Sequence, residues 1–157
     1  MKTSNDPRHV ARRLALQVLF AWEGNRRLAR WLPGQTEARY KCARQLYREW
    51  THRKYTAEEY FDYQLLQLLV KRIVRKAERF DELIADSAPE WPLDQIAPID
   101  LIILRIAVAE LTQKGDLPYK VVIDEAVELA KEFGGDNSSK FINGVLGTIV
   151  EKLGKVK

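Results

Sequence analysis

The apolar positions near the start of the chain recur at helical spacing and predict an amphipathic helix over residues 7–24, with Asp6 as its N-cap. Its buried stripe consists of Val10, Ala11, Leu14, Val18 and Trp22. At about 100° per residue, the opposite side holds His9, Arg13, Leu16, Gln17 and Phe20. An aromatic ring among cationic and polar side chains on a solvent face has no folding role. Phe20 is therefore predicted to stack on a nucleobase or to contact a partner protein, unless a second helical layer covers this side.

Helical periodicity continues along the rest of the chain, and no convincing strand pattern interrupts it. Further helices are predicted over 36–54, 98–113 and 118–133, and one runs from the Thr56-Ala-Glu-Glu59 capping box to just before Pro89. Asp136-Asn-Ser-Ser139 offers N-cap candidates for a last helix that ends near Leu153. A proline-rich connector over 88–98 is expected to hold a short helical turn. The broad apolar face of 98–113 predicts a central helix, and Gly134-Gly135 are expected to end the helix over 118–133 in a left-handed cap. The predicted fold class is all-α, with six or seven helices.

Length and cysteine content restrict the class of protein. A chain of 157 residues fits one domain or two very small halves that share a core. Its single cysteine, Cys42, excludes an internal disulfide and suits a reducing cytoplasm. Arg12-Arg13 before an apolar stretch faintly resembles a secretory signal, but Gln17 interrupts the stretch and no cleavage motif follows. No segment approaches the ~18 uninterrupted apolar residues of a membrane span. We expect a soluble cytoplasmic protein that does not contact a membrane.

Charge is distributed unevenly along the chain. Residues 1–80 hold 18 Lys and Arg against 8 Asp and Glu, whereas residues 81–157 hold 8 against 14. The first part therefore carries a net charge of +10 and the second a net charge of −6. Arginine dominates the basic residues near the N-terminus, and guanidinium groups bind phosphates and stack on bases. This asymmetry indicates that the first half faces a polyanion.

The last predicted helix carries a second aromatic outside its buried stripe. Phe141 lies about 100° from the centre of that stripe, beside Lys140 and directly after the loop Gly134–Ser139. This segment combines unpaired backbone N–H groups, a lysine, two serine hydroxyls and an aromatic ring. The combination predicts a binding site for a nucleotide phosphate and base. Gly144 inside this helix is expected to permit a close backbone approach, and Asn143 to bond a neighbouring loop or helix end.

Candidate catalytic chemistry is weak. Cys42, His9 and His52 are the only residues that offer a nucleophile with a base, and they lie in no supporting motif. Four carboxylates recur at helical spacing: Asp124, Glu125, Glu128 and Glu132. They indicate a solvated helix face and not a metal site, because a lysine is interleaved among them and no histidine is near. The chain has neither a glycine-rich phosphate loop nor a zinc pattern. We therefore predict no catalytic residue, no cofactor and no metal.

Four blocks of the sequence resemble the NusB family of transcription antitermination proteins. They are Ala11-Arg-Arg-Leu-Ala-Leu-Gln-Val-Leu-Phe-Ala-Trp22, Leu104-Arg-Ile-Ala-Val-Ala-Glu-Leu111, the stretch from Pro118 to Gly134, and Ser139-Lys-Phe-Ile-Asn-Gly-Val-Leu146. The blocks cover roughly half the chain, and their order is specific. Three departures from the family pattern stand out: the arginine cluster is sparse, Phe20 stands where tyrosine is common, and Asp124 replaces the usual asparagine.

The resemblance implies a fold and a function. The fold would be two packed three-helix bundles in a single RNA-binding domain over 1–157. The protein would bind the boxA element of nascent ribosomal RNA leader transcripts with the ribosomal protein NusE. It would act as a non-catalytic scaffold on elongating RNA polymerase with other Nus factors. By position, the RNA-facing residues would be Arg8, Arg12, Arg13, Phe20, Lys140 and Phe141. Asp94 and Asp100 would lie near the protein partner or the RNA edge.

Two other functions stay open at this point. A related helical domain serves certain ribosomal RNA cytosine methyltransferases, although this chain has no Rossmann-like glycine motif. A protein-interaction module or homodimer would instead hide Phe20 and Leu16 at a subunit interface.

Overall fold

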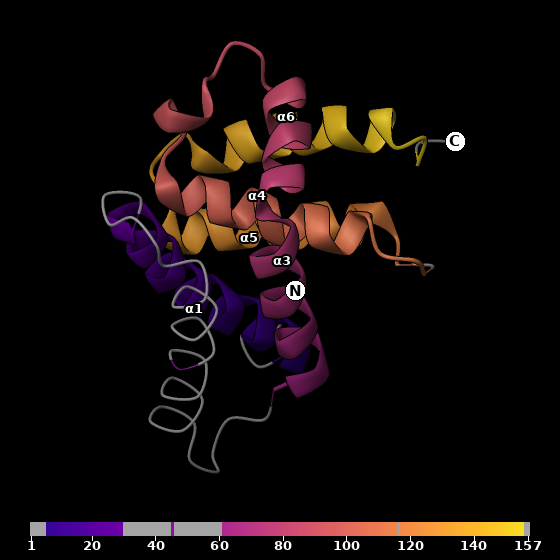
Figure 1. The fold of residues 1–157 in the computed structure, drawn as a ribbon. Coiled ribbons are helices and arrows are strands. Elements are labelled where there is room, and N and C mark those ends of the chain that lie inside the picture. The colour runs from indigo at the N-terminus through magenta and orange to yellow at the C-terminus, as the bar shows by residue number, and fades with distance from the viewer. Residues whose placement is uncertain (1–5, 30–44, 46–60, 116, 156–157) are drawn as a thin grey trace. The chain divides into compact units, whose positions relative to one another are not determined.

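The computed structural model describes residues 6–29, 45, 61–115 and 117–155, and these residues form helices and no strand (Figure 1). The elements are α1 (Pro7–Ala29), α3 (Tyr63–Ser87), the 3₁₀ turn η1 (Leu93–Gln95), α4 (Pro98–Leu111), α5 (Tyr119–Phe133) and α6 (Ser138–Lys152). The predicted all-α class is confirmed. The described part holds five α-helices, below the predicted six or seven, and the helix predicted over 36–54 lies outside it apart from Gln45.

The chain divides into two compact units, Met1–Val74 and Arg75–Lys157. In the first unit, α1 begins where the sequence predicts, because the Arg8 amide donates to Asp6 Oδ1 at 2.8 Å. This bond lowers the pKa of the Asp6 carboxyl below its usual value. The helix runs five residues past the predicted end at Gly24. Glu23 and Arg26, one turn apart, pair across this point and support the extra turn.

The start of α3 differs from the prediction. Residues 61 and 62 are not helical, so the helix begins at Tyr63 and not at the capping box of residues 56–59, which lies outside the described residues. Asp62 provides the cap: its Oδ1 accepts from the Leu65 amide at 2.9 Å. The Asp62 amide also donates to the Pro7 carbonyl at 3.0 Å, which ties the start of α3 to the start of α1. The helix ends at Ser87, before Pro89 as predicted.

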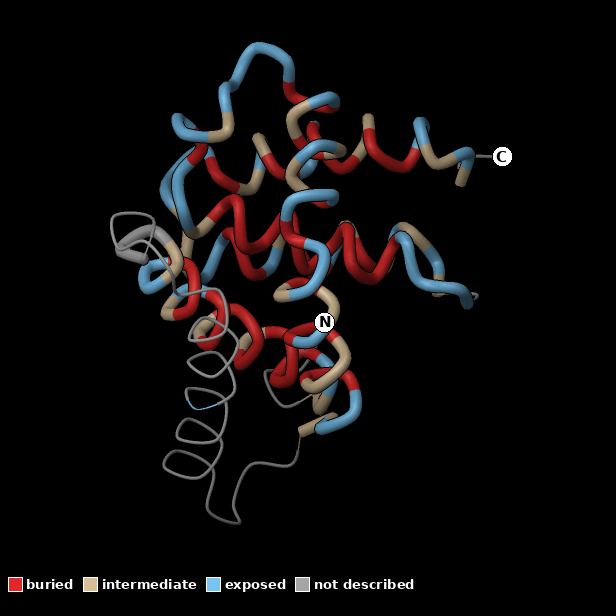
Figure 2. The backbone as a smooth tube through the Cα atoms, viewed as in Figure 1, coloured by how far each residue is buried: buried red, intermediate tan, exposed pale blue. Residues whose placement is uncertain are grey.

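In the second unit, α4 is the central helix, as its broad apolar face predicts. Every residue from Asp100 to Leu111 is buried (Figure 2). Helices α5 and α6 pack against α4 and against each other. On α5, Glu125 is buried, so it does not belong to the exposed acidic face expected from the sequence, whereas Asp124 and Glu128 are exposed.

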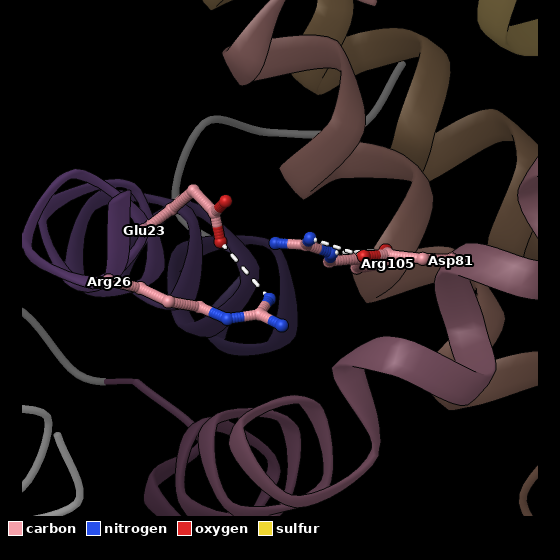
Figure 3. Close-up of polar contacts among 4 residues, drawn as sticks. All are labelled: Glu23, Arg26, Asp81 and Arg105. Carbon is pink, nitrogen blue, oxygen red and sulfur yellow. Dashed lines mark hydrogen bonds and ion pairs between the residues drawn. The ribbon is translucent and has the colours of Figure 1, made fainter. Parts of the chain in front are cut away.

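A buried ion pair links α3 to α4 within the second unit. Arg105 Nε donates to Asp81 Oδ1 and Arg105 Nη2 to Asp81 Oδ2, both at 2.7 Å (Figure 3). The Arg105 side chain is 1% exposed and the Asp81 side chain 16%. Two parallel bonds to one carboxylate fix both the distance and the orientation of the two helices at this point. A second link joins the ends of α6 and α3, because Lys152 Nζ donates to the Asp86 carbonyl.

Two glycines behave differently from the prediction. Gly134 has φ −89° and ψ −179°, an extended conformation and not the left-handed one. Glycine is required there because a Cβ would lie 2.5 Å from Ser138 Cβ and 2.7 Å from the Ala130 carbonyl oxygen. At Gly144 the predicted close approach is wrong, since a Cβ would meet nothing within 4 Å. Asn143 is exposed, and no hydrogen-bond partner for it lies within the described residues.

Within the described ranges, no helix is both long enough and apolar enough to cross a bilayer. The same residues contain no group of three or more potential metal ligands.

Candidate nucleic-acid interface

Helix α1 has one open sector, and Phe20 lies in it. Packing covers most of the helix circumference, so His9 and Leu16, expected on the solvent side, are buried at 8% and 1% exposure. Phe20 remains 49% exposed, and Arg13 and Gln17, which share its sector at helical spacing, are partly exposed. The predicted exposure of Phe20 and its common direction with Arg13 are confirmed.

The cations of α1 are divided between the surface and the interior. Arg8 is exposed in the first turn, whereas Arg12 is only 2% exposed, so its predicted position on the surface is wrong. Arg26 is also largely withdrawn from solvent. It pairs with Glu23 at 3.6 Å (Figure 3), and its guanidinium carbon lies 5.4 Å from the Trp22 ring centroid. Among the α1 cations whose side chains the structure describes, Arg8 is the exposed one, and Arg13 is partly exposed with its Nε buried.

The second unit contains the other predicted ring, and its environment differs from the prediction. Phe141, in the first turn of α6, is partly exposed, and the neighbouring Lys140 is fully on the surface. The Phe141 ring contacts Trp91 edge to face, with centroids 5.9 Å apart and planes at 69°. Trp91 was not predicted as a site residue. The available signal was a large aromatic between Pro89 and Pro92 that fits no helical stripe.

Ser138 organises the loop before α6. Its hydroxyl accepts from the Gly135 amide at 2.9 Å and donates to Asp100 Oδ2 at 3.1 Å. Ser138 is 7% exposed, so only one of the two serine hydroxyls expected to bind phosphate, that of Ser139, is partly accessible. The N-cap residue, Asn137, makes no side-chain capping bond. The first turn of α6 is therefore held by Ser138 and presents Ser139, Lys140 and Phe141.

The two acidic site residues lie in different environments. Asp94 is exposed on η1 and is therefore accessible to a partner protein. Asp100 is only 7% exposed and links the start of α4 to the start of α6 through Ser138, so it is not the surface group that the resemblance implies. Burial raises the pKa of the Asp100 carboxyl above 3.8, and the Ser138 hydrogen bond opposes this shift. Asp100 Oδ1 has no hydrogen-bond partner among the described residues.

The raised pKa of Asp100 gives a pH-dependent prediction. Between pH 3.8 and the raised pKa, the folded chain holds a proton that the unfolded chain releases, so this carboxyl lowers stability progressively as the pH rises. Asp100→Asn does not titrate. We expect its free energy of unfolding, relative to that of the unsubstituted chain, to increase between pH 4 and pH 7, measured by urea unfolding. A constant or decreasing difference across this range would contradict the assignment.

The described residues define an all-helical protein whose two units each present an aromatic ring beside a cation. The NusB family model matches residues 9–151. The chain is 39% identical to the transcription antitermination protein NusB of Chloroflexus aggregans over 92% of its own length and 87% of that protein. It is 37% identical to the NusB of Shewanella loihica, covering 92% and 96% of the two chains. The chain therefore belongs to the NusB family.

Solved structures agree with this assignment. A crystal form of T. maritima NusB matches with a TM-score of 0.73 and 29% identity, over 97% of this chain and 94% of that one. A chain from a structure described as a plectonemic RNA supercoil matches with a TM-score of 0.74 and 25% identity, over 95% and 97%. The predicted family and fold are thus confirmed, and the relatives are named for antitermination and not for a catalysed reaction.

Proposed function

We propose that this protein is a transcription antitermination factor that binds boxA-type single-stranded RNA together with the ribosomal protein NusE. It acts in the cytoplasm as a non-catalytic scaffold on elongating RNA polymerase with other Nus factors, and residues 1–157 serve as one RNA-binding domain. Membership of the NusB family supports this function. The observation that carries it is the exposed Phe20 ring in the same sector of α1 as Arg13.

The chemistry of each unit, taken by itself, suits unpaired RNA. In the first unit Arg8 and Arg13 offer charges for phosphates and Phe20 a ring for a base; in the second unit Lys140 and Phe141 offer the same two groups. Arg12 is left out of this set because it is buried. Stacking on a ring needs a base that is not already stacked in a duplex, which favours single-stranded RNA.

Charge supports a basic protein as the second partner. The second half of the chain carries a net charge of −6, and Asp94 is exposed on η1. A ribosomal protein that itself binds RNA is basic, and complementary charge accelerates association and selects the partner. Asp100 contributes by holding α4 and α6 together and not by direct contact.

Titration of boxA-type RNA at several salt concentrations tests this proposal. Three phosphate contacts predict that log K falls with log salt at a slope of about −2. Phe20→Ala and Phe141→Ala should each weaken binding by about 1–3 kcal/mol, with the unfolding midpoint used to confirm that the variants fold. Affinity that is independent of salt, or equal for boxA and scrambled RNA, would contradict the proposal. A homodimer that persists in excess RNA and NusE would favour the interaction module.

A further inference from the structure

Trp91 is an exposed aromatic held on a rigid segment. It is 50% exposed, and only Phe20 and Tyr63 are comparable among the large hydrophobic residues that the structure describes. The Trp91 amide donates to the Ala88 carbonyl at 3.0 Å, and Pro92 directly precedes η1. A turn followed by a proline fixes the backbone below the ring, so the ring is presented to solvent at low entropic cost.

The geometry of the ring pair restricts what it can bind. Trp91 and Phe141 are inclined at 69°, so a flat base cannot stack on both rings at once. Bases stacked separately on the two rings would be inclined to each other by a similar angle. Consecutive bases in a duplex are nearly parallel, whereas those of an unpaired, splayed strand are not. The corner formed by the two rings therefore suits two unstacked nucleotides of a single strand.

We propose that Trp91 is an RNA contact: it stacks on the base that neighbours the one on Phe141. This inference rests on the proposed RNA-binding function and adds a residue to its surface. Lys140, exposed beside Phe141, provides a charge for the connecting phosphate. On the connector, Glu90 and Asp94 are exposed near Trp91 in the sequence and repel phosphate, so Trp91 contacts the base and not the backbone.

The experiment compares three variants of the full chain in a fluorescence-anisotropy titration with boxA-type RNA. We expect Trp91→Leu to weaken binding about 5- to 50-fold and Trp91→Phe, which keeps a ring, to weaken it less. The matched control is Tyr63→Leu, since Tyr63 is also 50% exposed and lies 6.4 Å from another ring, that of Phe61. Affinity should be unchanged in this control. Thermal unfolding of each variant separates binding from stability.

Two further readouts distinguish a contact from a positioning role. Because Trp91 acts through its ring, Trp91→Leu should leave the slope of log K against log salt unchanged, whereas Lys140→Ala should make it less steep by about 0.7. RNA should quench tryptophan fluorescence in the unsubstituted chain, and Trp91→Phe should lose most of this quenching. Because the chain holds three other tryptophans, the decisive outcome is the change: quenching of the same amplitude in Trp91→Phe as in the unsubstituted chain would show that no base lies on Trp91.

The outcomes also separate this inference from the proposed function. If the unsubstituted chain binds RNA and Trp91→Leu binds equally well, the inference is overturned and the proposed function stands. If the unsubstituted chain binds no RNA, both fail. If Trp91→Leu keeps its RNA affinity but loses capture of purified NusE, Trp91 belongs to a protein interface, which also overturns the inference.

Discussion

Replacement of Asp81 by alanine is expected to lower the free energy of unfolding by about 3–5 kcal/mol, because it removes the carboxylate from a buried arginine. Arg105 is 1% exposed, and two of its nitrogens donate to Asp81 at 2.7 Å. An ion at this depth has lost most of its hydration, which Asp81 replaces. For a chain of this length, the thermal midpoint should fall by about 6–20 °C, as measured by circular dichroism or calorimetry.

Two control variants test the cause of this loss. Glu128→Ala removes a carboxylate from an exposed pair with Lys131, whose N–O distance is 3.5 Å, and should change stability by less than about 1 kcal/mol. The double variant with Asp81→Leu and Arg105→Met replaces the buried pair by apolar side chains and should recover most of the stability lost in Asp81→Ala. A double variant as unstable as Asp81→Ala would indicate that the Asp81–Arg105 pair itself, and not the cost of burying Arg105 without this carboxylate, carries the stabilisation.

The helices were predictable where one short segment determines them. The helical periodicity of the α3 segment and the broad apolar face of α4 are local patterns; both helices are confirmed, and α4 is buried from Asp100 to Leu111. The start of α3 was misplaced because Thr56 and Asp62 both precede apolar periodicity, and the sequence does not show which residue caps the helix. The Asp81–Arg105 pair was not predicted, because its residues lie 24 positions apart and meet only through packing.

In the candidate site, too, the features set by one short segment were predictable and those set by packing between elements were not. Phe20 and Arg13 were placed correctly because helical geometry alone gives their common direction. Arg12 and Asp100 were expected on the surface, but their burial depends on neighbouring elements that periodicity does not reveal. Trp91 was missed for the converse reason: it lies in an irregular connector, and its contact with Phe141 is made across 50 positions of sequence.

Gly134 lies in the loop before α6, next to the candidate site, and its replacement by alanine is expected to cause the second large loss of stability. The Gly134 amide donates to the Ala130 carbonyl at 2.9 Å, and an added Cβ would lie 2.7 Å from that same oxygen and 2.5 Å from Ser138 Cβ. Neither neighbour is a flexible chain end. The loop must therefore move, which disrupts the hydrogen bonds of Ser138 to Gly135 and Asp100. We expect a loss of about 2–4 kcal/mol, measured by urea unfolding.

Two other glycines provide matched controls for Gly134→Ala. At Gly135 an added Cβ would be 3.9 Å from Ser138 Oγ, an ordinary contact, so Gly135→Ala should be nearly neutral. At Gly144 the space is open inside α6, so Gly144→Ala should raise the free energy of unfolding by about 0.5–1 kcal/mol. An unchanged free energy of unfolding in Gly134→Ala would show that the close approach to Ser138 relaxes without cost.

Since Ser138 holds the first turn of α6, the Gly134 variant should also weaken RNA binding under conditions where it remains folded. The two control variants should bind RNA as the unsubstituted chain does.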